Sequence, residues 1–122
     1  MFGYVTNYIM RWYIVLINQE EGLGRVRGNK ALYKRMLSMF IDTKDAEQLD
    51  VFLEQGNLEE ASHSSHAIKG IAGNLSLIDL FAISDKLTEE LRKNIKDEAT
   101  IAEFHDILAE TRNVVGETIL TL

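Results

Sequence analysis

The stretch SHSSHAIKGIAGNL, from Ser62 to Leu75, places two histidines, a lysine and two glycines inside a run that otherwise has the spacing of a helix. Such spacing lines up one face of an α-helix, which a neighbouring element must cover. The stretch therefore predicts an amphipathic helix, with Asn57 as its N-cap and Glu59 and Glu60 in its first turn. Its apolar or small face consists of Leu58, Ala61, Ser65, Ile68, Ala72 and Leu75.

The same steps of three and four residues recur on both sides of this helix. Upstream they mark a helix that ends near DTKD at 42–45 and a shorter one that ends at Gly56, where glycine suits a left-handed cap. Downstream they mark two helices joined by the turn KDEAT at 96–100, capped by Asp97 or Thr100 and expected to form an antiparallel hairpin. The predicted stripes are Leu32, Met36 and Phe40; Ala46, Leu49 and Leu53; Leu77, Leu80, Ser84, Leu87 and Leu91; and Ile101, Phe104, Leu108, Thr111, Val115, Thr118 and Leu122.

The composition limits which fold classes and which functions are possible. The chain has 122 residues, which fits one domain, and it contains no proline, the residue that most strongly interrupts helices. We therefore expect an all-α protein. The absence of cysteine excludes disulfides and thiolate metal sites and is compatible with a reducing cytoplasm. A formal net charge of −6 without a basic patch argues against nucleic-acid binding.

Residues 1–17 form a distinct apolar segment. The sequence WYIVLIN at 12–18 has the composition of a strand, but a lone strand in a helical chain would leave its backbone unpaired. We therefore expect an N-terminal helix over 1–17 and a helical bundle domain over 18–122. The segment is short and carries Arg11, so we expect no stable membrane insertion; packing on the bundle, pairing of two copies and contact with a membrane surface stay open. Its stripe is Phe2, Val5, Ile9, Trp12 and Leu16.

Helical geometry separates the polar residues of the opening stretch. At about 100° per residue, His66 and His63 project away from the apolar face into solvent, whereas Lys69 and Ser62 lie at its flanks. An exposed neutral imidazole is a competent nucleophile at neutral pH. A lysine one turn away attracts a phosphoryl oxygen as a point charge. We therefore predict that His66 accepts a phosphoryl group, with Lys69, Ser62 and His63 beside it.

Two glycines follow His66 on its own side of the helix, Gly70 after one turn and Gly73 after two. A glycine inside a helix costs about 1 kcal/mol relative to alanine. We interpret the pair as a surface where a partner approaches the backbone closely.

Simpler interpretations exist for the histidines. A histidine on a helix surface is most often a solvated side chain, and we expect His105 to be structural. The spacing of Glu60 and His63 matches half of the motif that binds metal in di-iron bundles. The chain has no second copy of that motif, and the residues are expected to face outward, so we predict no metal site.

The glycine-rich sequence EEGLGRVRGN at 20–29 superficially resembles a phosphate-binding loop. It lacks the Gly-Lys-Ser/Thr ending of a P-loop and does not lie in a βαβ unit. We expect a turn and a short helix there, with Arg25 and Arg27 as ordinary surface charges.

The sequence HAIKGIAGNL at 66–75 resembles the signature of histidine-containing phosphotransfer (HPt) domains, in which the phosphorylatable histidine precedes a lysine, a glycine, small residues and an aliphatic one. EEGLGRVRGNKALYKRMLSMF at 20–40 and LFAISDKLTEELRKN at 80–94 are similar to other helices of the family, so the resemblance spans 18–122. Ile71 and Ser76 depart from the family pattern and are expected to alter the docking rim. The matching residues are His66, Lys69, Gly70, Ala72 and Leu75.

The resemblance implies an antiparallel up-and-down four-helix bundle, with additional N-terminal helices, that carries phosphoryl groups in a multistep two-component phosphorelay. His66 would accept the group from a receiver-domain aspartate and pass it to another receiver domain. The implied partners are response-regulator receiver domains and a hybrid sensor histidine kinase; Mg²⁺ would lie on the receiver, and the chain itself would need no cofactor. It would be a cytoplasmic carrier and not a kinase, since Ala67 stands where sensor kinases usually place an acidic residue. The alternative is a non-catalytic helical interaction or dimerisation module.

Overall fold

The computed structural model of the protein describes residues 15–122, and this part of the chain is helical without any strand. The expectation of an all-α protein is therefore confirmed. Its helices are α2 (Gln19–Arg25), α3 (Lys30–Asp42), α4 (Asp45–Glu54), α5 (Leu58–Leu75), α6 (Ile78–Arg92) and α7 (Glu98–Thr121).

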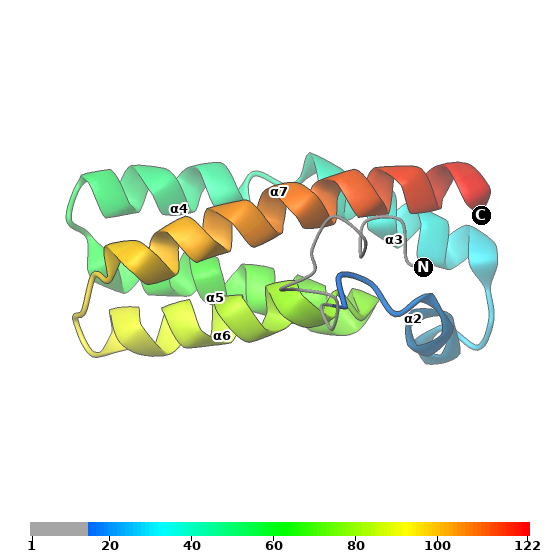
Figure 1. Cartoon of the computed structure of the whole chain (residues 1–122), viewed down its shortest axis with the longest axis horizontal. Helices are drawn as coiled ribbons and strands as arrows, with labels where there is room; N and C mark the ends of the chain where they lie inside the picture. Colours follow the sequence, from blue (N-terminus) through cyan, green and yellow to red (C-terminus); the bar gives the residue numbers. More distant parts are fainter. Residues whose placement is uncertain (1–14) are drawn as a thin grey trace, which may run out of the picture.

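The helices form an antiparallel bundle with α5 and α6 as its most extensive pair (Figure 1). Helix α4 packs on α5, and α7 packs on α6 and α3. Helices α3 and α4 follow one another end to end, so together they fill one of four positions, and the chain then runs up and down through α5, α6 and α7 (Figure 1). Helix α2 packs on α3 and α5 at one end. The predicted four-helix bundle with an additional N-terminal helix is confirmed.

The helix boundaries follow the polar residues that cap them. The side chain of Asn57 accepts a hydrogen bond from Glu60 N at the start of α5. Asp97, and not Thr100, caps α7, because its carboxylate accepts from the amides of Ala99 and Thr100. Gly56 has φ 71° and takes the left-handed conformation expected after α4.

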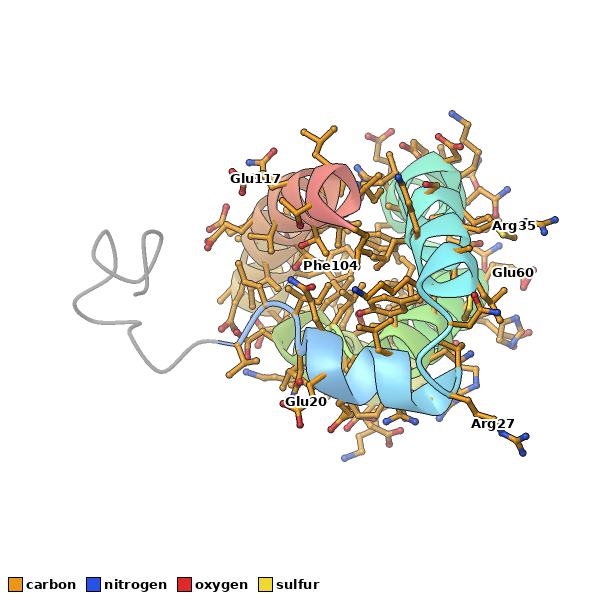
Figure 2. All side chains as sticks on the ribbon, turned by 90° about the vertical axis from the view of Figure 1, so that its right-hand side faces the viewer. Glu20, Arg27, Arg35, Glu60, Phe104 and Glu117 are labelled. Carbon is orange, nitrogen blue, oxygen red and sulfur yellow. The ribbon has the colours of Figure 1, made fainter. Side chains whose placement is uncertain are left out.

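The core is built from the predicted stripes with one correction. On α3 the buried face is Tyr33, Leu37 and Phe40, whereas Leu32 is 40% exposed. The buried set is spaced by four and three residues and the predicted set by four and four, and both spacings fit one face of a helix, so spacing alone does not distinguish them. The Tyr33 hydroxyl donates to Leu75 O at 2.9 Å, which ties α3 to the end of α5. Figure 2 shows the ring of Phe104 among the helices and the charged side chains around the rim.

The segment before α2 differs from its prediction. Residues 15–17 are not helical, and residues 1–14, which carry most of the predicted N-terminal helix, lie outside the described part of the chain. Val15 O accepts from Asp79 N at 3.1 Å, and Asn18 N donates to Ser76 O at 2.9 Å. The segment is thus bonded to the α5–α6 turn and to the first turn of α6 in place of the backbone hydrogen bonds of a helix. Leu16, which was predicted to belong to the apolar stripe of this segment, is 1% exposed.

The glycine-rich sequence at 20–29 forms α2 and a turn, as expected. Gly22 is buried in α2, and a Cβ there would overlap the ring of Tyr33. Glycine is thus required for α2 to approach α3 closely. Within residues 15–122, no helix is both long enough and apolar enough to cross a membrane.

Candidate functional site

Helix α5 presents one face to the core and the opposite face to solvent, as its spacing predicted. Ala61, Ser65 and Ala72 are buried, whereas His63 and His66 are exposed. Ser62, expected at the flank, is only 4% exposed, and its hydroxyl donates to Glu59 O at 2.6 Å. The Ser62 hydroxyl therefore donates its hydrogen bond to a backbone carbonyl of its own helix and is not presented to a partner.

His66 lies beside a cation that the sequence analysis did not identify. Its Nδ1 is 3.5 Å from Nη2 of Arg92, in the last turn of α6. A second guanidinium nitrogen, Nη1, pairs with Glu89 at 3.2 Å. The short turn at 76–77 could have indicated this neighbour. A tight hairpin of two helices places the end of the second helix, where Arg92 lies, beside the first half of the first helix, which carries His66.

Lys69 does not extend freely toward His66. Its Nζ lies 2.8 Å from Oδ1 of Asp85 and 5.6 Å from the centre of the Phe81 ring, both on α6. The Lys69 side chain is 25% exposed, which agrees with its predicted place at the flank of the helix. The Lys69 ammonium is therefore held by two side chains of α6.

The two glycines of α5 have different surroundings. A Cβ at Gly70 would meet nothing within 4 Å, so the backbone there is bare to solvent. A Cβ at Gly73 would lie 3.2 Å from Phe81 Cε1. Gly70 therefore fits the expected open surface, whereas Gly73 has a packing role inside the molecule.

Buried hydroxyls beneath His66 connect α5 to α6. The hydroxyls of Ser65 and Thr88 are 2.7 Å apart, and both residues are fully buried. Ser65 Oγ also donates to Ser62 O at 3.1 Å, and Thr88 Oγ1 lies 2.7 Å from Ser84 O. A buried polar pair is costly to leave unsatisfied, so it favours this register of the two helices. The register brings Asp85 to Lys69 and Arg92 to His66.

The other histidines have carboxylate partners. His63 Nδ1 lies 2.8 Å from Oε2 of Glu60 on its own helix. His105 Nε2 lies 2.7 Å from Oδ1 of Asp50, so it links α7 to α4. In the described residues, no group of three or more histidine or carboxylate side chains is arranged to hold a metal ion.

A groove of about 460 Å³ lies between α3 and α5. Apolar side chains line most of it, including Met36, Met39 and Phe40 from α3 and Ile71 from α5. Met39 is 64% exposed. Asn74, which also lines the groove, is one turn after Gly70, so the groove adjoins the bare backbone of α5.

The second departure from the family pattern, Ser76, is not on a rim. It is 2% exposed, and its Oγ donates to Oε1 of Glu21 at 2.7 Å and accepts from Nε of Arg25 at 3.2 Å. Arg25 is thus part of a link between α2 and the end of α5, which corrects its interpretation as an ordinary surface charge. The pKa of Glu21 is lowered by the hydrogen bond from Ser76 and then by Arg25.

A family model for the Hpt domain matches residues 35–114 of the chain. The match contains all of α4, α5 and α6 and most of α7, and therefore the whole His66 surface described above. No curated protein and no solved structure matches the chain significantly.

Proposed function

This chain belongs to the Hpt domain family, and we propose that it carries a phosphoryl group on His66 between the aspartates of two receiver domains. Hpt domains are phosphocarrier modules of histidine phosphorelays and not kinases. The proposal assigns that general role to one residue of this chain and to one class of partner.

One observation carries the proposal: His66 is an exposed imidazole with Arg92 beside it and bare helix backbone one turn away. The imidazole supplies the nucleophile. The guanidinium supplies positive charge for phosphoryl oxygens. The open backbone at Gly70 allows the partner to bring its own reactive group close.

The transfer exchanges one bond to phosphorus for another. With its proton on Nδ1, the neutral ring attacks through Nε2, the bond from phosphorus to the receiver's aspartate oxygen breaks, and the carboxylate leaves. The Nε2–P bond that forms conserves the reactivity of the group, so the reverse reaction can pass it to a second receiver. We propose that Mg²⁺ lies on the receiver, which leaves this chain to supply the imidazole and the cations around it.

The contact between Arg92 and His66 bears on where the ring proton lies, because a guanidinium only donates hydrogen bonds. Its contact with Nδ1 requires the ring proton to be on Nε2, which is the tautomer that does not attack. The 3.5 Å separation is at the limit of a hydrogen bond, so the contact is weak and readily released. Release frees Arg92 to bind the phosphoryl oxygens.

The groove between α3 and α5 completes the proposed receiver surface. Its apolar lining by Met36, Met39 and Ile71 offers area for burial, and methionine side chains adapt to different partners. This property suits a carrier that must bind two receivers in turn.

The experiment is transfer from receiver domains carrying ³²P on their aspartate. Wild-type protein should acquire label that is acid-labile and alkali-stable, as expected for phosphohistidine. The label should be absent in His66→Gln. It should persist in His63→Gln, the matched control, because His63 is exposed on the same helix and also pairs with a neighbouring side chain.

Label that persists in His66→Gln would contradict the assignment of the acceptor. Wild-type protein that takes no label from several receivers, yet binds them, would instead support the alternative of a non-catalytic interaction module.

A further inference from the structure

Helix α6 holds the Lys69 ammonium through two side chains that are one helical turn apart. Phe81 places its ring 5.6 Å from Nζ, and Asp85 places Oδ1 at 2.8 Å. Phe81 and Asp85 are four residues apart and so share one face of α6. Cation–π attraction and the ion pair act on the same ammonium. Lys69 thus has a defined resting position that is directed at α6.

Gly73 makes this resting position available. The ring of Phe81 lies against the α5 backbone at Gly73, where a Cβ would be 3.2 and 3.3 Å from two ring carbons. Gly73 is one turn after Lys69 on α5, so the ring lies beside the lysine stem. The glycine lowers helix stability, and its presence is explained by the space that it leaves for the Phe81 ring.

The ion pair is of a strength that a second anion can displace. The Asp85 side chain is 47% exposed, and ion pairs of this exposure contribute about 0.2–1 kcal/mol. A phosphoryl group carries more negative charge and more acceptor oxygens than a carboxylate. Lys69 is three residues after His66 on the same helix, within reach of a group bound there.

We propose that Asp85 is a positioning residue that competes with the phosphoryl group on His66 for the Lys69 ammonium. Asp85 thereby sets how strongly the protein retains the phosphoryl group: with Asp85 present, phosphorylation must first draw Lys69 away from α6. A carrier benefits from this, since a group held too tightly is not passed on. The inference rests on the function proposed above.

Phosphoramidate is the probe, because a small donor removes any effect of receiver docking. The Nε2–P bond forms as the P–N bond of phosphoramidate breaks, and the ring proton leaves with ammonia as ammonium. At a fixed ammonium concentration, ³¹P NMR then measures the ratio of phosphohistidine to donor at equilibrium.

Asp85→Asn should raise the equilibrium constant for phosphohistidine by about 1.4- to 5-fold, the range that an exposed ion pair allows. Asp85→Glu should restore the wild-type value. Asp106→Asn is the matched control, because it removes the same charge from an exposed position on α7, which packs on α6 and α3 and not on α5. It should leave the constant unchanged.

The decisive comparison uses Lys69→Met. In that background, Asp85→Asn should give no gain, because there is no ammonium left to release. An equal gain with and without Lys69 would show simple charge repulsion and overturn the inference, as would an unchanged constant in Asp85→Asn alone. Wild-type protein that forms no phosphohistidine would instead overturn the proposed function and the inference with it.

Discussion

Gly70 and Gly73 are the same residue type on the same helix, but their surroundings give them different roles. Both lie inside the same continuous helix, at a cost in conformational entropy. Gly73 is used by Phe81 of the same molecule, whereas Gly70 has open space where a side chain would be. Within residues 15–122, no atom occupies the space beside the bare backbone at Gly70, which is compatible with the docking role that we propose for it.

We predict that Gly70→Ala raises the free energy of unfolding by about 0.5–1 kcal/mol, because alanine favours the helix and meets no neighbour. The same change should slow phosphoryl transfer from a receiver about tenfold, since a methyl group at a close-packed interface costs roughly 1–3 kcal/mol. Chemical denaturation and receiver-dependent labelling measure the two effects.

Labelling by phosphoramidate is the control for Gly70→Ala and should be unchanged, because no docking is involved. Gly73→Ala should gain less stability, since its Cβ must displace the ring of Phe81. Normal transfer from receivers by a stabilised Gly70→Ala protein would contradict a docking role for this position.

At the scale of elements, α2 is held to the rest of the bundle by a small polar cluster. Ser76 takes the left-handed conformation, with φ 59°, at the end of α5. Its hydroxyl bonds to both Glu21 and Arg25 of α2. A glycine would adopt this backbone more easily, so serine is explained by the contact that it makes across the two helices.

The cluster predicts a pH dependence for Ser76→Ala. Because the folded pKa of Glu21 is lowered from 4.5, first by Ser76 and then by Arg25, its contribution to stability is present above about pH 4.5 and is lost as the pH falls through the folded pKa. Ser76→Ala removes the main cause. The wild-type protein should therefore be the more stable at pH 7, and the difference should shrink toward pH 3 in urea titrations.

Ser76→Gly separates the two roles of this residue. It loses the same hydrogen bonds but relieves the left-handed backbone, which is worth about 1 kcal/mol. It should therefore be more stable than Ser76→Ala at every pH. A stability difference between wild type and Ser76→Ala that stays constant from pH 7 to pH 3 would contradict the link to Glu21.

At the scale of the whole molecule, the apolar core and not surface charge holds the bundle together. Helices α4 and α7 are linked at the surface by two side-chain contacts, a hydrogen bond between Asp50 and His105 and an ion pair of Glu47 with Arg112. In contrast, Phe104 of α7 is fully buried within the main core cluster.

We predict that Asp50→Asn lowers the free energy of unfolding by less than about 1 kcal/mol, because the pair is almost half exposed. Phe104→Ala should lower it by about 3–5 kcal/mol through the lost burial and the cavity. Urea denaturation of both variants gives the comparison. A larger loss in Asp50→Asn than in Phe104→Ala would show that the α4–α7 link is a main support of the fold.

The sequence predicted most of the elements, because helix periodicity and caps are local properties. Asn57, Gly56 and Asp97 act as caps where their residue types indicated. The error in the α3 stripe arose where two registers fit the same spacing, and tertiary packing of Tyr33 decided between them. At 15–18 the backbone bonds to Ser76 and to Asp79 at the start of α6 stabilise a non-helical segment despite its helical spacing.

The sequence by itself determined the helical class, the exposed face of α5 and the candidate His66, because one helix and its solvent side follow from a repeat of three and four residues. Only the tertiary structure decided what surrounds that residue. Arg92 and Asp85 come from α6, and their place depends on how two helices pack and on the register that Ser65 and Thr88 favour. The opening stretch thus specifies the nucleophile, whereas the charges around it depend on the contact between two helices, which no local pattern contains.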